Sequence, residues 1–211
     1  MSKVSLIKIS EILGMSKSTV SKALNNYADV SPSTRKKVQD LADKLNYKPN
    51  ISAQNLRSQE SKIIGLLIPE IVHYFFSTII SGVTETAEKY GYSVIVAQTK
   101  DDYKSEIKQL ELLLDKNVDG ILLSLADNTI QFNHVKDVIN QGVPFVLYDR
   151  ISKLIDCNKV VIDDVKAAEM ATQHLIDTGC KKIAIIRNQL KSQGTIDRHK
   201  GFKKALLENG M

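Results

Sequence analysis

The sequence predicts two domains of different fold class: a small all-α headpiece at the N-terminus, then an α/β domain with a parallel, doubly wound sheet. Three short amphipathic patterns fill the first 48 residues. From Ile63 onward, apolar runs alternate with longer amphipathic stretches, the pattern of a parallel sheet with helices on both faces. Residues 1–62 contain 11 Lys/Arg and 5 Asp/Glu, a net charge of +6. Residues 63–211 contain 18 Lys/Arg and 19 Asp/Glu, a net charge of −1, so all the excess positive charge lies in the first part of the chain. This excess indicates a polyanionic partner, either a nucleic acid or an anionic membrane surface.

The composition excludes several other classes of protein. With 211 residues, 43% hydrophobic and 25% charged, the chain is typical of a globular protein. It has no apolar run of the roughly 18 residues that a membrane span needs, and the N-terminus lacks the apolar region of a signal peptide. We therefore expect a cytoplasmic protein with no membrane partner. Cys157 and Cys180 lie far apart in sequence, so we interpret them as buried hydrophobes or free thiols rather than a disulfide.

The first two helices are predicted from apolar spacing and local end signals. Leu6, Ile9 and Leu13 follow helical spacing, and Gly14 supplies the backbone freedom for a stop. A second helix over residues 17–24 has Ser16 as its expected N-cap. Its inward positions are Val20, Ala23 and Leu24. Its other face carries Lys17, Ser18, Ser21 and Lys22.

A third helix begins at Ser31-Pro32, because Ser31 can cap and Pro32 suits the first helical position. Its expected core positions are Val38, Leu41, Ala42 and Leu45. Three short helices with this spacing predict a helix-turn-helix, whose second helix enters the major groove of DNA. Lys can donate to guanine and Ser can pair with several bases. The alternative is that the polar face of the second helix is only solvated.

The headpiece resembles that of the lac repressor family. The resemblance rests on Val4-Ser-Leu-Ile-Lys-Ile-Ser-Glu-Ile-Leu-Gly-Met-Ser-Lys-Ser-Thr-Val-Ser-Lys-Ala-Leu-Asn25, Val30-Ser-Pro-Ser-Thr-Arg35 and Leu45-Asn-Tyr-Lys-Pro-Asn50. It implies base contacts from Lys17, Ser18 and Lys22. It also implies contacts, mostly to phosphate, from Ser5, Ser16, Thr19, Ser21 and Asn25.

Residues 49–62 are predicted to form a hinge helix and linker between the two domains. Pro49 breaks the third helix, and residues 51–57 allow only about two helical turns, which are marginal alone. The resemblance implies that two hinges pair across a homodimer on double-stranded operator DNA. Asn50, Ala53 and Leu56 would then contact DNA, with Leu56 wedged in the minor groove. The alternative is an ordinary linker.

The α/β domain is expected over residues 63–211. Its predicted strands are Ile63–Ile68, Ser93–Ala97, Gly120–Leu125, Pro144–Tyr148, Val160–Ile162 and Lys182–Arg187. Its predicted helices are Phe75–Tyr90, Tyr103–Asn117, Phe132–Gln141, Val165–Thr178 and Arg198–Glu208. Ligands of such folds bind beyond the carboxyl ends of the strands.

The predicted strand ends carry carboxylates, a guanidinium group and aromatic rings, which suit a sugar. They are Pro69-Glu-Ile-Val-His-Tyr-Phe-Phe76, Thr99-Lys-Asp-Asp102, Ser124-Leu-Ala-Asp127, Tyr148-Asp-Arg150 and Asp163-Asp164. Strand-end carboxylates often merely cap the next helix, and that explanation remains open for Asp101, Asp102, Asp163 and Asp164.

This region also resembles the lac repressor family and its periplasmic sugar-binding relatives. The markers are Val118-Asp-Gly-Ile-Leu122, Pro144-Phe-Val-Leu-Tyr-Asp149, His174-Leu-Ile-Asp-Thr-Gly179 and Arg198-His-Lys-Gly-Phe202. The resemblance implies a periplasmic-binding-protein-like domain whose small-molecule effector is a carbohydrate or a carbohydrate derivative. Asp149 and Arg198 would hold its hydroxyls or a carboxylate. Tyr74 or Phe75 would pack on it, with Asp101 assisting. His73 and Tyr74 replace the family's common Asn-Pro pair, which alters the wall of the site.

The family's effector domain has two similar lobes, here a first lobe at about 63–160 and a partial second lobe at about 161–211. Because the second lobe would normally continue beyond Met211, we expect a fragment, with a natural truncation as the alternative. The sequence thus predicts a ligand-controlled transcription regulator, most simply a repressor, with the ligand as inducer or co-repressor.

Two other classes are less consistent with the sequence. An enzyme on this fold would need a nucleotide, nucleophile-elbow or zinc motif, and none is present. The four histidines, His73, His134, His174 and His199, have no ligand spacing. We therefore expect no catalytic residue, metal site or cofactor. A transport-type sugar-binding protein would need a signal peptide and no headpiece.

Overall fold

The computed structural model describes residues 4–47, 60–187 and 192–211. The chain divides into two compact units, Met1–Gln59 and Glu60–Met211, and each is described by itself. Within the described ranges, no helix has the length and apolar character needed to cross a membrane.

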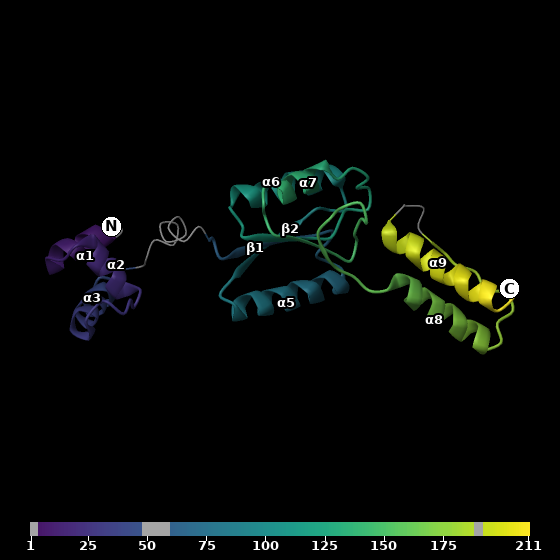
Figure 1. Cartoon of the computed structure of the whole chain (residues 1–211), viewed down its shortest axis with the longest axis horizontal. Coiled ribbons are helices and arrows are strands. Elements are labelled where there is room, and N and C mark those ends of the chain that lie inside the picture. The colour runs from purple at the N-terminus through teal and green to yellow at the C-terminus, as the bar shows by residue number, and fades with distance from the viewer. Residues whose placement is uncertain (1–3, 48–59, 188–191) are drawn as a thin grey trace. The chain divides into compact units, whose positions relative to one another are not determined.

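Over residues 4–47, the N-terminal unit forms a bundle of three helices, α1 (Leu6–Leu13), α2 (Lys17–Leu24) and α3 (Pro32–Lys44) (Figure 1). All three begin where the sequence predicts, and α1 and α2 also end there. They surround one small core of buried side chains, which are Ile9, Val20, Ala23, Val30, Val38 and Ala42. Leu24, Leu41 and Leu45 pack against this core but are only partly buried.

Local end signals fix these helices. Gly14 ends α1 at a φ of 62°, a left-handed conformation that glycine adopts without strain. The Ser16 hydroxyl accepts a hydrogen bond from the Thr19 amide (3.1 Å) at the start of α2. Ser31 accepts from the Thr34 amide (3.2 Å) at the start of α3, where Pro32 occupies the first turn. Each cap satisfies an amide that the helix itself leaves unpaired.

The second unit contains a sheet of five parallel strands in the order β2-β1-β3-β4-β5. The strands are β1 (Ile63–Ile68), β2 (Ser93–Gln98), β3 (Gly120–Leu123), β4 (Phe145–Tyr148) and β5 (Asn158–Val160). The helices between them are α5 (Tyr74–Lys89), α6 (Tyr103–Asp115) and α7 (Asn133–Asn140). This parallel α/β arrangement confirms the predicted fold class.

Helices cover both faces of the sheet, as Figure 1 shows, with α6 and α7 on one side and α5 on the other. Leu110 and Leu113 of α6 pack with buried residues of β1, β3 and β4. On the opposite face, Phe76 of α5 packs against Leu66 and Ile68. Alternate residues of β1 therefore enter different cores, which explains why that strand is a continuous apolar run.

The structure corrects two predicted strands. The expected strand at Val160–Ile162 lies two residues earlier, as β5, the fifth strand of the same sheet. Residues 182–187 form no strand, and Ile186 is fully exposed. A strand requires a hydrogen-bonded neighbour, and no described residue pairs with this segment, so its apolar composition is not sufficient.

The last two helices, α8 (Asp164–Asp177) and α9 (Gln193–Glu208), lie side by side (Figure 1). Helix α9 begins five residues before the predicted start at Arg198. The two helices approach closely at Gly201, where an added Cβ would lie 2.0 Å from the Val165 carbonyl oxygen. Lys204 forms an ion pair with Glu169 across the pair at 3.0 Å.

A three-donor contact holds the start of β1. The Asp119 carboxylate accepts hydrogen bonds from the Ser61 amide (2.6 Å), the Ser61 hydroxyl (2.8 Å) and the Lys62 amide (2.9 Å). We call these three residues the Asp119 clamp. Since Asp119 directly precedes β3, the clamp ties the entry of one central strand to its neighbour.

Candidate functional site

The N-terminus of α2 presents a polar, exposed surface. Ser16, Lys17 and Ser18 are exposed, and Thr19 and Ser21 are partly buried. The Ser16 hydroxyl lies 2.8 Å from the hydroxyls of Ser18 and Thr19. The hydroxyls of Ser18 and Thr19 can each make a further hydrogen bond, and the helix N-terminus adds positive potential that attracts phosphate.

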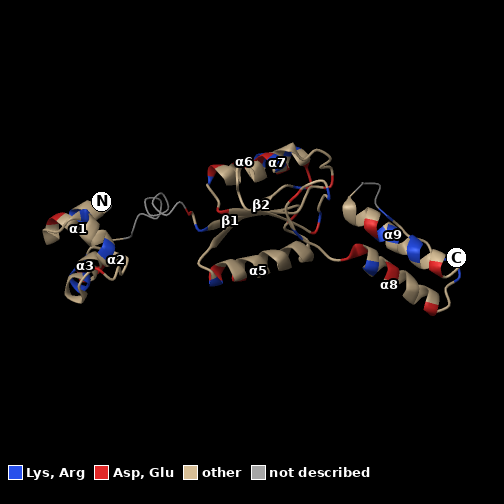
Figure 2. Ribbon diagram, in the orientation of Figure 1, with Lys and Arg blue, Asp and Glu red and all other residues tan. Residues whose placement is uncertain are grey.

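Further predicted contact residues lie at the ends of α1 and α2. Ser5 is exposed and caps α1, accepting from the Lys8 amide at 3.3 Å. Asn25 follows α2, and its side-chain amide donates to the Ser21 carbonyl at 2.8 Å. Figure 2 shows Lys and Arg on α2 and α3 of this unit. The predicted hinge contacts Asn50, Ala53 and Leu56 lie outside the described residues.

Lys22 is not isolated on this surface. Its ammonium group forms an ion pair with the carboxylate of Asp29, in the loop between α2 and α3. The hydrogen bond from Lys22 lowers the pKa of Asp29 below its usual value. The Asp29 carboxylate therefore carries its charge at neutral pH. Asp29 was not singled out from the sequence, because it lies seven residues from Lys22 outside any periodic pattern.

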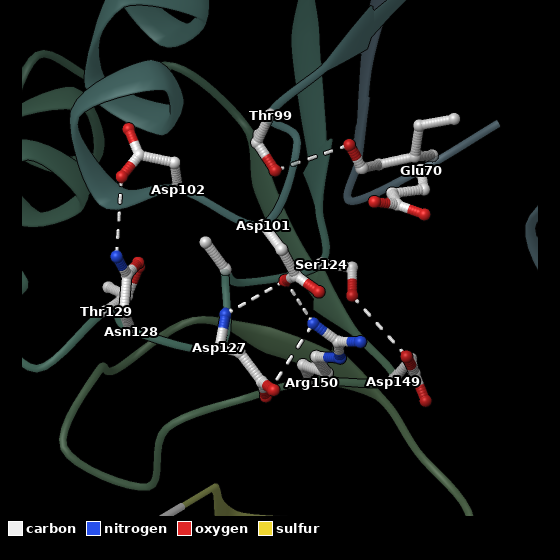
Figure 3. Close-up of polar contacts among 12 residues, drawn as sticks. Glu70, Thr99, Asp101, Asp102, Ser124, Asp127, Asn128, Thr129, Asp149 and Arg150 are labelled. Carbon is white, nitrogen blue, oxygen red and sulfur yellow. Dashed lines mark hydrogen bonds and ion pairs between the residues drawn. The ribbon is translucent and has the colours of Figure 1, made fainter. Parts of the chain in front are cut away.

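A second polar cluster lies at the carboxyl ends of β2, β3 and β4 (Figure 3). Arg150 Nη1 forms an ion pair with Asp101 and lies 3.7 Å from the Asp127 carboxylate. Asp101 also accepts from the Asp127 amide at 3.0 Å. Asp101 therefore joins two strand ends rather than capping a helix. The cap of α6 is Asp102, which accepts from the Ser105 amide at 2.9 Å.

Asp149 lies apart from that ion pair. Its carboxylate is partly buried, and the Ser124 hydroxyl donates to it at 3.5 Å (Figure 3). Burial raises the pKa of Asp149, and the attraction of Arg150 and Arg198 opposes this only in part. A weakly bonded carboxylate in a partly dry setting is a strong acceptor for a ligand hydroxyl.

Four of the five predicted effector residues line one open cleft of about 520 Å³: Tyr74, Phe75, Asp149 and Arg198. This volume falls within the range of small-molecule sites, about 300–1,000 Å³. The fifth, Asp101, does not line the cleft, but it holds Arg150, which does. The cleft thus combines aromatic rings, a carboxylate acceptor and guanidinium donors.

Sequence reasoning missed several lining residues. They are Ser192, Gly194 and Thr195, whereas His73, Phe76, Arg150 and Asp164 lie in the strand-end motifs but were not assigned an effector contact. Arg150 directly follows Asp149 in the strand-end motif, which was a usable signal. Asp164 does not cap α8, since Asp163 does so by accepting from the Lys166 amide at 2.9 Å. Asp164 instead pairs with Arg198 at 2.8 Å.

Comparison with known proteins defines the class. Residues 9–50 match the family described as bacterial regulatory proteins, lacI family. Residues 61–211 match periplasmic binding proteins and the sugar binding domain of the LacI family. A helix-turn-helix headpiece with such a binding domain defines the architecture of a bacterial regulator. The chain belongs to the LacI family.

Individual relatives agree with this assignment. The chain is 33% identical over 209 residues to catabolite control protein A of Priestia megaterium, covering 99% of this chain and 62% of that protein. It is 35% identical over 201 residues to the NTD biosynthesis operon regulator NtdR of Bacillus subtilis, covering 95% of this chain and 60% of that protein. The chain therefore spans about three fifths of the length of these curated relatives. A solved lac repressor dimer, bound to operator and an anti-inducer, superimposes with a TM-score of 0.84 at 25% identity, covering 100% of this chain and 63% of that one.

Proposed function

We propose that this chain is the DNA-reading and effector-sensing part of a transcription repressor that binds a near-palindromic operator as a dimer. The observation that carries the proposal is the Ser16-capped helix α2, which presents Lys17, Ser18 and Lys22 from a compact three-helix unit. Base edges in the major groove offer acceptors for such donors, and the net charge of +6 over residues 1–62 favours the phosphate backbone. Such a regulator acts in the cytoplasm.

The remaining contact residues have supporting roles in this proposal. Ser5, Ser16, Thr19, Ser21 and Asn25 contact mostly phosphate, which sets the register of the headpiece on the duplex. Asn50, Ala53 and Leu56 contact DNA from the hinge, with Leu56 in the minor groove. The operator-bound lac repressor dimer that this chain resembles supports this geometry.

Selection of bound duplexes from a random DNA pool, at a stated salt concentration, tests DNA reading directly. We expect a recurrent half-site, alone or in inverted pairs. Lys22→Ala should relax preference at one base pair of that half-site by about 1–3 kcal/mol, because the lost donor no longer distinguishes guanine. Lys36→Ala is the matched control for the loss of one positive charge, because Lys36 is an exposed residue of α3. Binding without any sequence preference would instead identify a non-specific DNA binder.

We further propose that the cleft binds a neutral carbohydrate. Arg150 is already paired with Asp101, and Arg198 is already paired with Asp164, so neither cation demands a ligand anion. Asp149 and the guanidinium groups can hold hydroxyls, while Tyr74 and Phe75 offer ring faces to C–H groups. Relatives support this ligand class, including the ribose operon repressor of Haemophilus influenzae, 34% identical over 200 residues, covering 95% of this chain and 59% of that protein.

Thermal shift assays with ribose, glucose and cellobiose test the cleft. A sugar that binds should raise the melting temperature of the wild type, because a ligand specific to the folded state stabilises it. Arg198→Ala should abolish that rise, whereas Lys200→Ala on the same helix should preserve it. Lys200 is not among the residues that line the cleft, and its ammonium group lies 3.5 Å from the Asp197 carboxylate. An equal rise in both variants would remove Arg198 from the binding site.

A further inference from the structure

The loop that faces α2 is held in one conformation. The Tyr27 amide donates to the Lys22 carbonyl (3.0 Å), and the Val30 amide donates to the Tyr27 carbonyl (3.3 Å). From α3, Arg35 Nη2 donates to the Tyr27 carbonyl (2.9 Å) and the Val30 carbonyl (3.3 Å). Val30 is also part of the buried core. Asp29, between these anchored residues, is therefore fixed beside Lys22.

The ion pair itself is exposed, with 42% of the Lys22 side chain and 55% of the Asp29 side chain accessible. Exposed pairs contribute little to stability, so the loop does not depend on this one for its fold. In the absence of DNA, the Lys22 ammonium group nevertheless has the Asp29 carboxylate as its partner. Lys22 has an anionic partner beside it on the surface that is proposed to read DNA.

We propose that Asp29 determines the specificity of DNA recognition by holding Lys22 away from phosphate and releasing it only to acceptors on a base. The inference rests on the proposed function. A phosphate that approaches Lys22 also approaches Asp29 and is repelled by it. The O6 and N7 atoms of guanine carry only partial negative charge, so Asp29 repels them much less than it repels a phosphate. Asp29 thus weakens non-specific binding more than specific binding, which is how selectivity arises from a repulsive element.

Asp29→Asn tests this mechanism in the whole chain. On duplexes lacking the selected half-site, we expect affinity to rise about threefold to tenfold at low salt. The plot of log affinity against log salt should steepen by about 0.9, the value for one added phosphate contact. The ratio of specific to non-specific affinity should fall. Circular dichroism verifies that the headpiece stays helical.

Asp40→Asn is the matched control, since Asp40 is an exposed carboxylate on α3 and its loss changes the net charge equally. A double-mutant cycle with Lys22→Gln then isolates the pair. In the Lys22→Gln background, Asp29→Asn should have no more effect than Asp40→Asn.

Other results would overturn the inference. If Asp29→Asn matches Asp40→Asn with Lys22 intact, general charge alone explains its effect. If preference at one base disappears while non-specific affinity is unchanged, Asp29 reads that base itself. Either result leaves the proposed function intact as long as a half-site is selected. Binding without any selected half-site, or no binding at all, overturns both.

Discussion

Glu106 is the buried polar residue whose replacement gives the clearest test of the effector domain. It lies on α6, and its side chain is completely buried. Its Oε2 accepts from the Ala126 amide at 2.5 Å, and its Oε1 accepts from the Thr129 hydroxyl at 3.0 Å. His134 Nε2 lies 2.8 Å from the same Oε1. One side chain thus holds the connection between β3 and α7 at three points.

Glu106→Gln keeps the shape but replaces one acceptor oxygen by a donor. If the new amide faces Ala126, the buried Ala126 N–H loses its acceptor. If it faces Thr129 and His134, their hydroxyl and ring nitrogen must change from donating to accepting, so the present network is broken in either orientation. Hydrogen bonds to charged groups contribute about 1.5–3 kcal/mol, and an unpaired buried donor costs about 1–3 kcal/mol. We expect a loss of about 2–4 kcal/mol in the free energy of unfolding.

Urea denaturation, monitored on the unfolding transition of the α/β domain, measures this loss. Glu111→Gln is the matched control, because Glu111 lies on the same helix but is exposed. Surface changes of that kind are usually within about 0.5 kcal/mol of neutral. If the two variants unfold within that margin of each other, the reasoning about Glu106 is refuted.

Two further changes probe the helix pair and the cleft. Gly201→Ala should force α8 and α9 apart, because the new Cβ would lie 2.0 Å from the Val165 carbonyl oxygen. We expect the amides of α8 to exchange their hydrogens faster in the variant, and unchanged exchange would contradict the close approach of the two helices. Asp149→Asn should stabilise the domain increasingly as pH rises above about 3.9, the usual Asp pKa. Because its pKa is raised on folding, the folded protein holds the proton more tightly and wild-type stability falls as pH rises through that range. Melting temperatures of the variant and the wild type, measured from pH 3.5 to 7, check this prediction. If the advantage of the variant over the wild type shrinks as the pH rises, the prediction is wrong.

The headpiece was the most predictable part of the chain. Gly14, Ser16, Ser31 and Pro32 act through their own backbone or the next turn, so the limits of these helices are readable from local sequence. The first four strands were predicted to within two residues, since each contains a short run of apolar residues that is visible in the local sequence.

The remaining features depend on partners that are distant in sequence. The apolar run inside residues 182–187 predicted a strand, but a strand requires a hydrogen-bonded neighbouring strand, which the described residues do not supply. The start of α9 was missed because Gly194 in its first turn is a weak helix former. The pairing of Asp101 with Arg150 joins residues 49 positions apart, and no periodicity reveals it.

The Asp119 clamp determines the residue at which the α/β domain should be joined to a different headpiece. Ser61 and Lys62 precede β1, yet their amides donate to the carboxylate of Asp119, which precedes β3 in the same domain. A recombination junction placed at Ile63 would remove the Ser61 hydroxyl that donates to Asp119, and the foreign segment would have to reproduce the path of residues 61 and 62 for its amides to reach that carboxylate. A junction before Glu60 keeps all of them together, along with the Glu60 to Lys62 ion pair at 2.7 Å. Chimeric regulators that combine this domain with a different headpiece should therefore be joined upstream of residue 60.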